Sequence, residues 1–271
     1  MLRGVRCVNS LPMIRAVSLL TILAVLLIAP LYAADAPVYE LRIYVCNEGK
    51  LPDLLKRFRD HTVKLFEKHG MTNVGYWVPT KKEDGSETTL IYILKHTNRE
   101  AAKASFAAFG KDPEWQATRK ASEENGKILA SPPESIFMAA TDYSPEIVVA
   151  AKDPARTFEL RIYETPEGKI APLNDRFRNH TMKLFSKHGM EHIGYWEPTD
   201  PDKKAGSKLI YVLAHQSEEA GLKSFEAFRA DPDWIAAKAA SEEKNGGSLT
   251  IPQPDGVRSI YMKPVDFSAM R

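Results

Sequence analysis

The sequence has little cysteine: Cys7 and Cys46 are the only two among 271 residues. Cys7 precedes an apolar stretch that we interpret as a presequence, so a mature chain would keep Cys46 alone. One cysteine excludes an intramolecular disulfide and a cysteine-based metal site. The sequence also lacks a glycine-rich phosphate loop, a GxSxG elbow and an HExxH motif. The common signatures of nucleotide binding, serine hydrolysis and zinc proteolysis are therefore missing.

An excess of one charge is missing as well. The chain has 37 basic and 35 acidic residues, and removal of the presequence takes away three arginines, which leaves 34 basic residues (37 less 3). A near-neutral chain without a dense basic tract argues against nucleic-acid binding, which needs concentrated lysine and arginine. The hydrophobic content of 44% and charged content of 27% are typical of a water-soluble globular protein.

The start of the sequence has its own pattern. Ala16 to Ala34 contains no charge, three arginines precede it, and the first acidic residue is Asp35. A basic start, an apolar middle and small residues at the end predict a secretory signal peptide over residues 1–33, cut after Ala33, and export to the periplasm or the exterior. An uncleaved membrane anchor is the alternative, because the run is just long enough to span a bilayer. A start at Met13 would give a shorter presequence.

The rest of the chain is a duplication with a constant offset of 119 residues. The repeated segments are ELRIY (40–44 and 159–163), RFRDHT/RFRNHT (57–62 and 176–181), KHGM (68–71 and 187–190) and GYW (75–77 and 194–196). A period this long indicates a repeated domain rather than a solenoid. We predict one domain over 38–140, a linker over 141–156 and a second domain over 157–265.

Each copy has the same order of predicted elements. Val38–Val45 alternates, with Tyr39, Leu41 and Ile43 on one face and Glu40, Arg42 and Tyr44 on the other, which predicts a half-buried strand. The remaining predicted elements are a helix from Leu51 to His69 ended by Gly70, a hairpin of Asn73–Pro79 and Thr88–His96, a helix opened by a Thr97/Glu100 capping box, a helix opened by Asp112-Pro113, and a strand over Ser135–Ala139. The order β-α-β-β-α-β predicts an α+β, ferredoxin-like fold.

In that fold, both helices cover one face of the sheet, and the other face needs a cover. Two copies in one chain can supply it, either by packing sheet against sheet or by closing into one shared α/β barrel with the helices outside. Glu40, Arg42 and Tyr44 are then expected to point into the space between the sheets, and so are their counterparts in the second copy.

Three motifs in each copy carry a family resemblance. They are YELRIY on the first strand, GYW after the first helix and DP-x-W after the second helix, with Phe158 replacing the first tyrosine in the second copy. In this order and spacing, the chain resembles two tandem NIPSNAP domains. The resemblance implies a domain of the dimeric α/β-barrel type, in a family whose activity is poorly defined. Related barrel families include cofactor-free oxygenases and haem-handling enzymes, a link of fold alone.

Six of the seven histidines recur as pairs: His61 and His180, His69 and His188, His96 and His215. His61 and His69 are eight residues apart on one helix, or roughly 12 Å, too far to share a metal ion. We interpret His69 as a residue that caps the helix C-terminus. His61 falls beside the apolar stripe, which favours a hydrogen-bonded core position over a general base in a cavity.

Arg42 and Arg161 are predicted on the face of the first strand that turns away from the helices. Two roles are given equal weight for these arginines: an ion pair with Glu40 or Glu159, or a clamp for an anionic ligand. For the GYW motif, one ring of each Tyr-Trp pair is expected to face the helices and the other to face away. The full predicted pocket set is Arg42, Tyr44, His61, Tyr76, Arg161, Tyr163, His180 and Tyr195.

The sequence therefore favours an exported protein that binds a small molecule or a protein partner at the barrel between the domains, without an assigned metal or cofactor. The alternative is a barrel enzyme of the monooxygenase or isomerase kind, cofactor-independent or haem-dependent. Nothing in the sequence chooses a substrate, and it leaves open whether the chain forms homo-oligomers.

Overall fold

The computed structural model of the chain describes residues 1, 4 and 36–271. The predicted signal peptide, apart from Met1 and Gly4, lies outside these residues. Among the helices of the described part, none is long and apolar enough to cross a membrane.

The first repeat consists of β1 (Val38–Val45), α1 (Leu51–Arg57), the π-helical turn η1 (Phe58–Thr62), α2 (Val63–Lys68), β2 (Thr72–Pro79), the 3₁₀ turn η2 (Lys82–Asp84), β3 (Thr89–His96), α3 (Arg99–Lys111), α4 (Pro113–Ser122) and β4 (Glu134–Ala140). The second consists of β5 (Thr157–Glu164), α5 (Ile170–Arg176), η3 (Phe177–Thr181), α6 (Met182–Lys187), β6 (Glu191–Pro198), η4 (Pro201–Lys203), β7 (Lys208–His215), α7 (Glu218–Ala230), α8 (Pro232–Lys244) and β8 (Val257–Pro264). Both repeats confirm the predicted β-α-β-β-α-β order.

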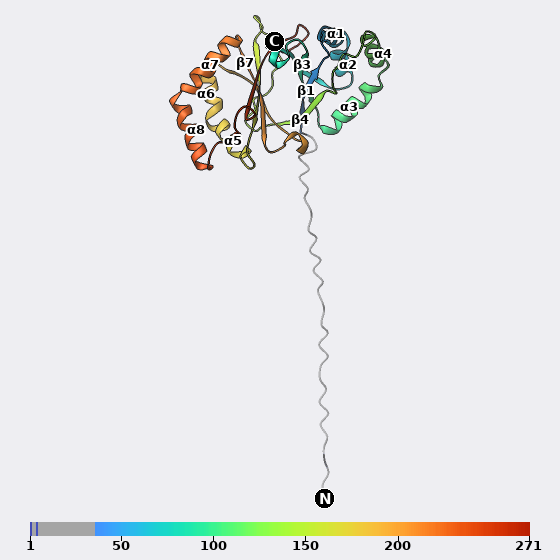
Figure 1. Cartoon of the computed structure of the whole chain (residues 1–271). Helices are drawn as coiled ribbons and strands as arrows, with labels where there is room; N and C mark the ends of the chain where they lie inside the picture. The colour runs from blue at the N-terminus through green and yellow to red at the C-terminus, as the bar shows by residue number, and fades with distance from the viewer. Residues whose placement is uncertain (2–3, 5–35) are drawn as a thin grey trace. The chain divides into compact units, whose positions relative to one another are not determined.

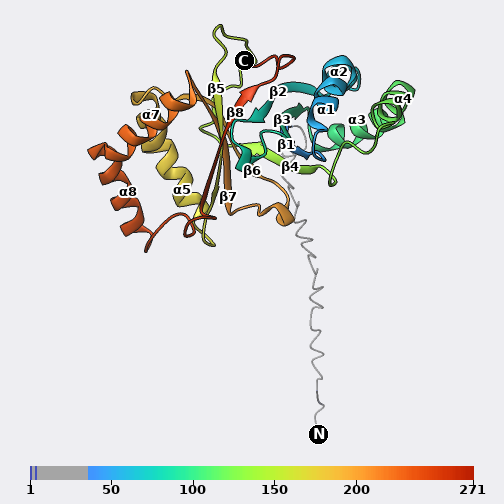
Figure 2. The same ribbon diagram turned by 45° about the horizontal axis from the view of Figure 1, so that its top comes forward.

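The eight strands form one closed barrel in the order β1-β3-β2-β8-β5-β7-β6-β4. Every neighbouring pair is antiparallel, and the two repeats join where β2 pairs with β8 and β4 pairs with β6. Helices α1–α4 lie on one side of the barrel and α5–α8 on the opposite side (Figures 1 and 2). The prediction of a shared barrel with external helices is thus confirmed.

The barrel interior is filled by apolar side chains from both repeats. Trp77 packs against Phe158 with ring centroids 5.4 Å apart, and Tyr39 packs against Trp196 at 5.6 Å, so the rings of each repeat contact those of the other. The other members include Leu41, Ile91, Met138, Leu160, Val212 and Met262. Burial of this apolar surface, at about 25 cal/mol per Å², is what holds the two repeats together.

The faces of β1 are the reverse of the prediction. Tyr39 and Leu41 belong to the barrel interior, whereas Tyr44 packs with the core between the sheet and α1–α4. The Arg42 guanidinium lies 4.8 Å from the Phe106 ring of α3, which places it on the helix side too. The prediction that Glu40, Arg42 and Tyr44 point between the sheets is therefore wrong. The interior of this barrel is filled by side chains, and the apolar face of β1 contributes to that filling.

The GYW motif divides its rings as predicted. Tyr76 belongs to the helix-side core and Trp77 to the barrel interior. The Trp77 ring lies over the Cα of Gly75, where a methyl group would overlap it, and Trp196 covers Gly194 in the same way. Glycine before the Tyr-Trp pair is thus required by close packing within the strand.

Two helix boundaries differ from the predictions. The N-cap of α3 is Asn98, whose side chain accepts a hydrogen bond from the Ala101 amide, so the Thr97 capping box is wrong by one residue. The first helix is divided by η1 instead of being regular from Leu51 to His69. The predicted N-cap of α4 is confirmed, because the Asp112 carboxylate accepts from the Glu114 amide at 2.8 Å.

Candidate functional site

A buried ionic cluster ties β1 to β3 and β4 on the helix side of the sheet. The Glu40 carboxylate is fully buried and accepts hydrogen bonds from Arg42, from Ser135 at 2.6 Å and from His96 Nε2 at 3.1 Å. Arg42 Nε donates to the Tyr92 hydroxyl at 2.9 Å. Burial raises the pKa of Glu40, but the bonds from His96, Arg42 and Ser135 outweigh it and hold the pKa below its usual value.

The second repeat reproduces this cluster residue for residue. Glu159 accepts from Arg161 at 2.5 Å, from Ser259 at 2.5 Å and from His215 at 3.0 Å. Arg161 Nε donates to Tyr211 at 2.8 Å. The predicted ion pairs between the two arginines and their neighbouring glutamates are confirmed. Each glutamate also has a buried histidine partner, His96 or His215. In the sequence, these two histidines could be recognised only as a repeated pair, without a partner.

The second repeat has a pocket of about 510 Å³ between β5 and the helices α7 and α8. Its wall is aromatic, from Tyr163, Phe225, Phe228 and Trp234. Its charged groups are Arg161, Arg229, Lys238 and Glu242. Arg161 therefore reaches the pocket from the buried cluster, with 12% of its side chain exposed.

The first repeat has a pocket of the same volume, about 510 Å³, in the corresponding place. Tyr44 and Trp115 line it, and the loop of residues 127–133 closes one side. Its charged groups are Arg57, Arg119, Lys127 and Glu123. We call these two sites the aromatic pockets.

The two aromatic pockets share four positions at the 119-residue offset: Tyr44/Tyr163, Trp115/Trp234, Arg119/Lys238 and Glu123/Glu242. Each pocket holds three basic groups and one acidic group. In each, the acidic group lies near the basic residue four positions earlier, with N–O distances of 3.7 Å in the first repeat and 3.6 Å in the second. A partly apolar site with surplus positive charge suits an organic anion.

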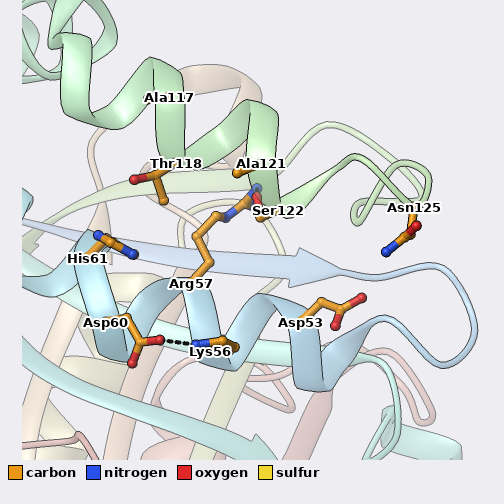
Figure 3. Close-up of a pocket in the computed structure, with 10 residues that line it drawn as sticks. All are labelled: Asp53, Lys56, Arg57, Asp60, His61, Ala117, Thr118, Ala121, Ser122 and Asn125. Carbon is orange, nitrogen blue, oxygen red and sulfur yellow. Dashed lines mark hydrogen bonds and ion pairs between the residues drawn. The ribbon is translucent and has the colours of Figure 1, made fainter.

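A second pair of sites lies between the first and last helices of each repeat. Figure 3 shows the one in the first repeat, a groove of about 500 Å³ between α1–η1 and α4. Its counterpart between α5–η3 and α8 measures about 210 Å³. The residue pairs that line both helix grooves are Arg57/Arg176, His61/His180, Ala121/Ala240, Ser122/Ser241 and Asn125/Asn245.

The structure distributes the predicted pocket residues over several places. Tyr44, Arg161 and Tyr163 line the aromatic pockets, and His61 and His180 line the helix grooves. Tyr76 and Tyr195 are completely buried in the helix-side cores, and Arg42 stays within its ion pair.

Two histidine interpretations need correction. His61 is not a core residue: 43% of its side chain is exposed, and its Nδ1 lies 3.8 Å from Glu114. The π-turn changes the helical phase at this point, which turns His61 away from the apolar stripe. His69 does end the helix, but its Nε2 contacts the Asp112 carboxylate at 2.7 Å instead of capping carbonyls.

Sequence reasoning missed the residues that α4 and α8 contribute. Trp115 and Trp234 pack at the edge of the helix-side cores, where both are partly exposed and line the aromatic pockets. Arg57 and Arg176, which line the helix grooves, lie inside the repeated RFR segments, and this repetition was the sequence signal that could have identified them.

The described residues contain no cluster of three His, Cys, Asp or Glu side chains that could hold a metal ion. Most histidine ring nitrogens already have a partner. Nε2 of His96 and His215 faces a glutamate, and Nε2 of His69 and His188 faces an aspartate. His192 contacts the hydroxyls of Ser186 at 2.9 Å and Tyr195 at 2.7 Å, and His61 and His180 line the helix grooves.

The barrel of two ferredoxin-like repeats, with a pocket between each sheet and its helices, defines a tandem α/β-barrel protein. The NIPSNAP family profile matches residues 39–145 and 158–268. The chain belongs to the NIPSNAP family, with two tandem copies of its domain, as the resemblance of the short motifs predicted.

Solved structures share the fold at low sequence identity. A Fusobacterium nucleatum protein provisionally named a monooxygenase is 13% identical, with 87% of this chain and 94% of that chain covered and a TM-score of 0.54. An anthrone oxidase-like protein is 15% identical, with 88% and 96% covered and a TM-score of 0.54. A NIPSNAP family protein of unknown function from Agrobacterium tumefaciens is 21% identical, with 41% and 94% covered and a TM-score of 0.35. No curated protein matches the chain.

Proposed function

We propose that each repeat binds a small organic anion with an aromatic or otherwise apolar body in its aromatic pocket. The observation that carries this proposal is the recurrence of one lining in both repeats: a tyrosine, a tryptophan, a basic residue and a glutamate around about 510 Å³. The volume falls within the roughly 300–1,000 Å³ of small-molecule sites.

Each kind of side chain in the pocket lining would contact a different part of the ligand. Trp234 and Tyr163 offer ring faces on which an apolar body can be buried, and Trp115 and Tyr44 do the same in the first repeat. Arg161 and Lys238 offer charged donors to a carboxylate or a related anion. The buried Glu159 holds the Arg161 side chain in place, so little conformational entropy is lost on binding.

The sequence predicted a ligand at the barrel between the two domains. The present proposal instead places the ligand between the strands of each repeat and the helices of the same repeat. The barrel interior is occupied by apolar side chains, and no residue of that interior core lines the aromatic pockets or the helix grooves.

A second candidate is an enzyme that moves a proton on the anion bound in the same pocket, without haem. The observation in its favour is the chain of hydrogen bonds from Tyr163, at the pocket, through Arg161 to the buried Glu159–His215 pair. Deuterium incorporation into the bound anion in D₂O, followed by mass spectrometry, separates this candidate from simple binding.

Tryptophan fluorescence titration with 1-naphthoate, and with the neutral 1-naphthamide as the matched control ligand, tests the binding proposal. We expect the anion to bind about tenfold more tightly, as one charge-assisted hydrogen bond predicts. The double variant Arg119→Gln/Lys238→Gln should reduce that preference, because each pocket loses one of its three basic groups, and Lys223→Gln, an exposed residue of α7 outside both pockets, should keep it. Equal affinity for the two ligands would refute the proposal.

We also propose that the protein acts outside the cytoplasm, because the uncharged segment before Asp35 has the pattern of an export signal. Mass spectrometry of the protein from its native compartment tests this: cleavage after Ala33 gives an N-terminal Ala34. A chain that keeps residues 1–33 in a membrane fraction would support the anchored alternative.

A further inference from the structure

The helix grooves carry an inference separate from the aromatic pockets. The grooves share the residue pairs Arg57/Arg176, His61/His180, Ala121/Ala240, Ser122/Ser241 and Asn125/Asn245. The arginine, histidine and asparagine of each groove offer hydrogen-bond donors, whereas the serine hydroxyls already donate to the carbonyls of Arg119 and Lys238 at 2.9 Å. The residues that differ between the grooves are the remaining charged or polar ones, such as Asp60 in the first and Asn179 in the second. The repeated part of the site is thus a donor set, which is what an oxyanion requires.

The central arginine is buried and incompletely satisfied. Arg57 is 4% exposed, and its Nη1 donates to Ser122 at 3.2 Å and, weakly, to Glu123 at 3.4 Å. Its Nε is buried without an acceptor among the described residues, and the same is true of Nε in Arg176. Burial lowers the pKa of both guanidinium groups, and the nearby glutamates oppose this only in part.

The π-turns lie beside the grooves. Arg57 is the last residue of α1 and His61 belongs to the turn at Phe58–Thr62, and both side chains line the groove opposite α4 (Figure 3). The Thr62 hydroxyl donates to the Arg57 carbonyl at 3.2 Å, and Thr181 does the same for Arg176. A π-turn is costlier than regular helix and is found often at functional sites, and here both repeats keep it.

The acidic residues around the grooves are already paired. Asp53 contacts Lys50 at 3.1 Å, Asp60 contacts Lys56, and Asp175 contacts Arg178 at 2.6 Å. Their negative charge is therefore largely compensated. The carboxylates near the donors are Glu123, 3.4 Å from Arg57 Nη1, and Glu114, 3.8 Å from His61 Nδ1.

We propose that each helix groove is a binding site for a compact oxyanion of the phosphate or carboxylate class, held by the arginine, histidine and asparagine that the two repeats share. The groove of the first repeat, with more than twice the volume of the other, also accommodates an oxyanion that carries a substituent. The site is distinct from the aromatic pocket, although Arg57 borders both in the first repeat.

NMR of the full mature chain labelled with ¹⁵N-histidine tests this proposal, with inorganic phosphate as the probe and His61→Gln and His180→Gln used to assign the two groove resonances. We expect phosphate to shift the imidazole signals of His61 and His180 in a saturable way, and to leave the buried His96 and His215 unchanged at constant pH. Phenyl phosphate should shift His61 more than His180, because only the first groove has room for the ring.

Asn125→Ala should weaken the phosphate response of His61 about tenfold, as the loss of one hydrogen bond from the groove donors predicts. The response of His180 should not change, so the second groove serves as the internal control. Equal, unsaturated shifts of all exposed histidines, or no shift up to millimolar phosphate, would overturn the proposal. The naphthoate titration is read at the tryptophans, so either proposal can fail while the other stands.

Discussion

Replacement of Glu40 by Gln should destabilise the fold more than an ordinary polar substitution. The carboxylate is fully buried and accepts from Arg42, Ser135 and His96. Loss of its charge leaves the Arg42 guanidinium, 15% exposed, without its ionic partner. Breaking a buried pair in this way costs roughly 3–5 kcal/mol, because one charge remains uncompensated in a medium of low polarity.

Urea unfolding at pH 7, followed by circular dichroism, measures this loss. Glu40→Gln should lower the free energy of unfolding by about 3–5 kcal/mol, and Ser135→Ala, which removes one hydrogen bond, by about 1 kcal/mol. Glu40→Gln/Arg42→Met should recover part of the loss, because both charges are then gone. A loss below about 1 kcal/mol for Glu40→Gln, or no recovery in the double variant, would refute the ion-pair account.

The sign of the pH dependence follows from the lowered pKa of Glu40. A carboxyl whose folded pKa lies below its unfolded value, here about 4.5, stabilises the fold fully above that value. The contribution is lost as the pH falls through the folded pKa. The stability of Glu40→Gln should therefore fall less steeply than that of the wild type in this acid range.

The remaining predictions concern packing, capping and pH. Gly75→Ala should cost roughly 1–3 kcal/mol in thermal or urea unfolding, since its methyl group overlaps the buried Trp77 ring. Gly110→Ala in α3, where a Cβ meets nothing within 4 Å, should instead stabilise by about 0.5–1 kcal/mol, and the opposite order would contradict the packing argument. Asn98→Ala should lower the free energy of unfolding by about 1 kcal/mol through loss of the α3 cap, whereas Thr97→Ala should change it by less than about 0.5 kcal/mol. Hydrogen bonds from Lys187 and His188 lower the pKa of Asp231 to about 2. The stabilisation that Asp231 gives should therefore be lost as the pH falls from about 3.8 toward 2. An Asp231→Asn variant whose stability follows the wild-type pH profile would show that the contact contributes nothing.

The repeat made most of the fold predictable from the sequence. Two copies of each strand pattern predicted the β-α-β-β-α-β order, and the uncovered sheet faces predicted either packed sheets or a shared barrel, of which the structure has the barrel. The alternation of β1 defined two faces but not which face the helices cover. We placed the charged residues between the sheets, because the sequence could not show that Tyr92, Ser135 and His96 satisfy Glu40 and Arg42 beneath α3.

The candidate sites depend on contacts that sequence periodicity does not carry. The Arg57 guanidinium lies 5.3 Å from the Trp115 ring, a contact between helices that are distant in the chain. The π-turn that moves His61 out of the apolar stripe has no marker in the spacing of hydrophobic residues. The sequence does contain one relevant signal, because Arg57, Trp115 and Ser122 all recur 119 residues later. This recurrence is compatible with a shared function as well as with a shared structure.

The most direct test of the account is the position of a bound organic anion. Crystals of the mature protein soaked in 4-bromobenzoate, with data collected at the bromine absorption edge, locate the ligand through its anomalous signal. The account predicts bromine peaks against Trp115 and Trp234, in the aromatic pockets between each sheet and its helices. Peaks inside the barrel, or at neither tryptophan under saturating ligand, would contradict it.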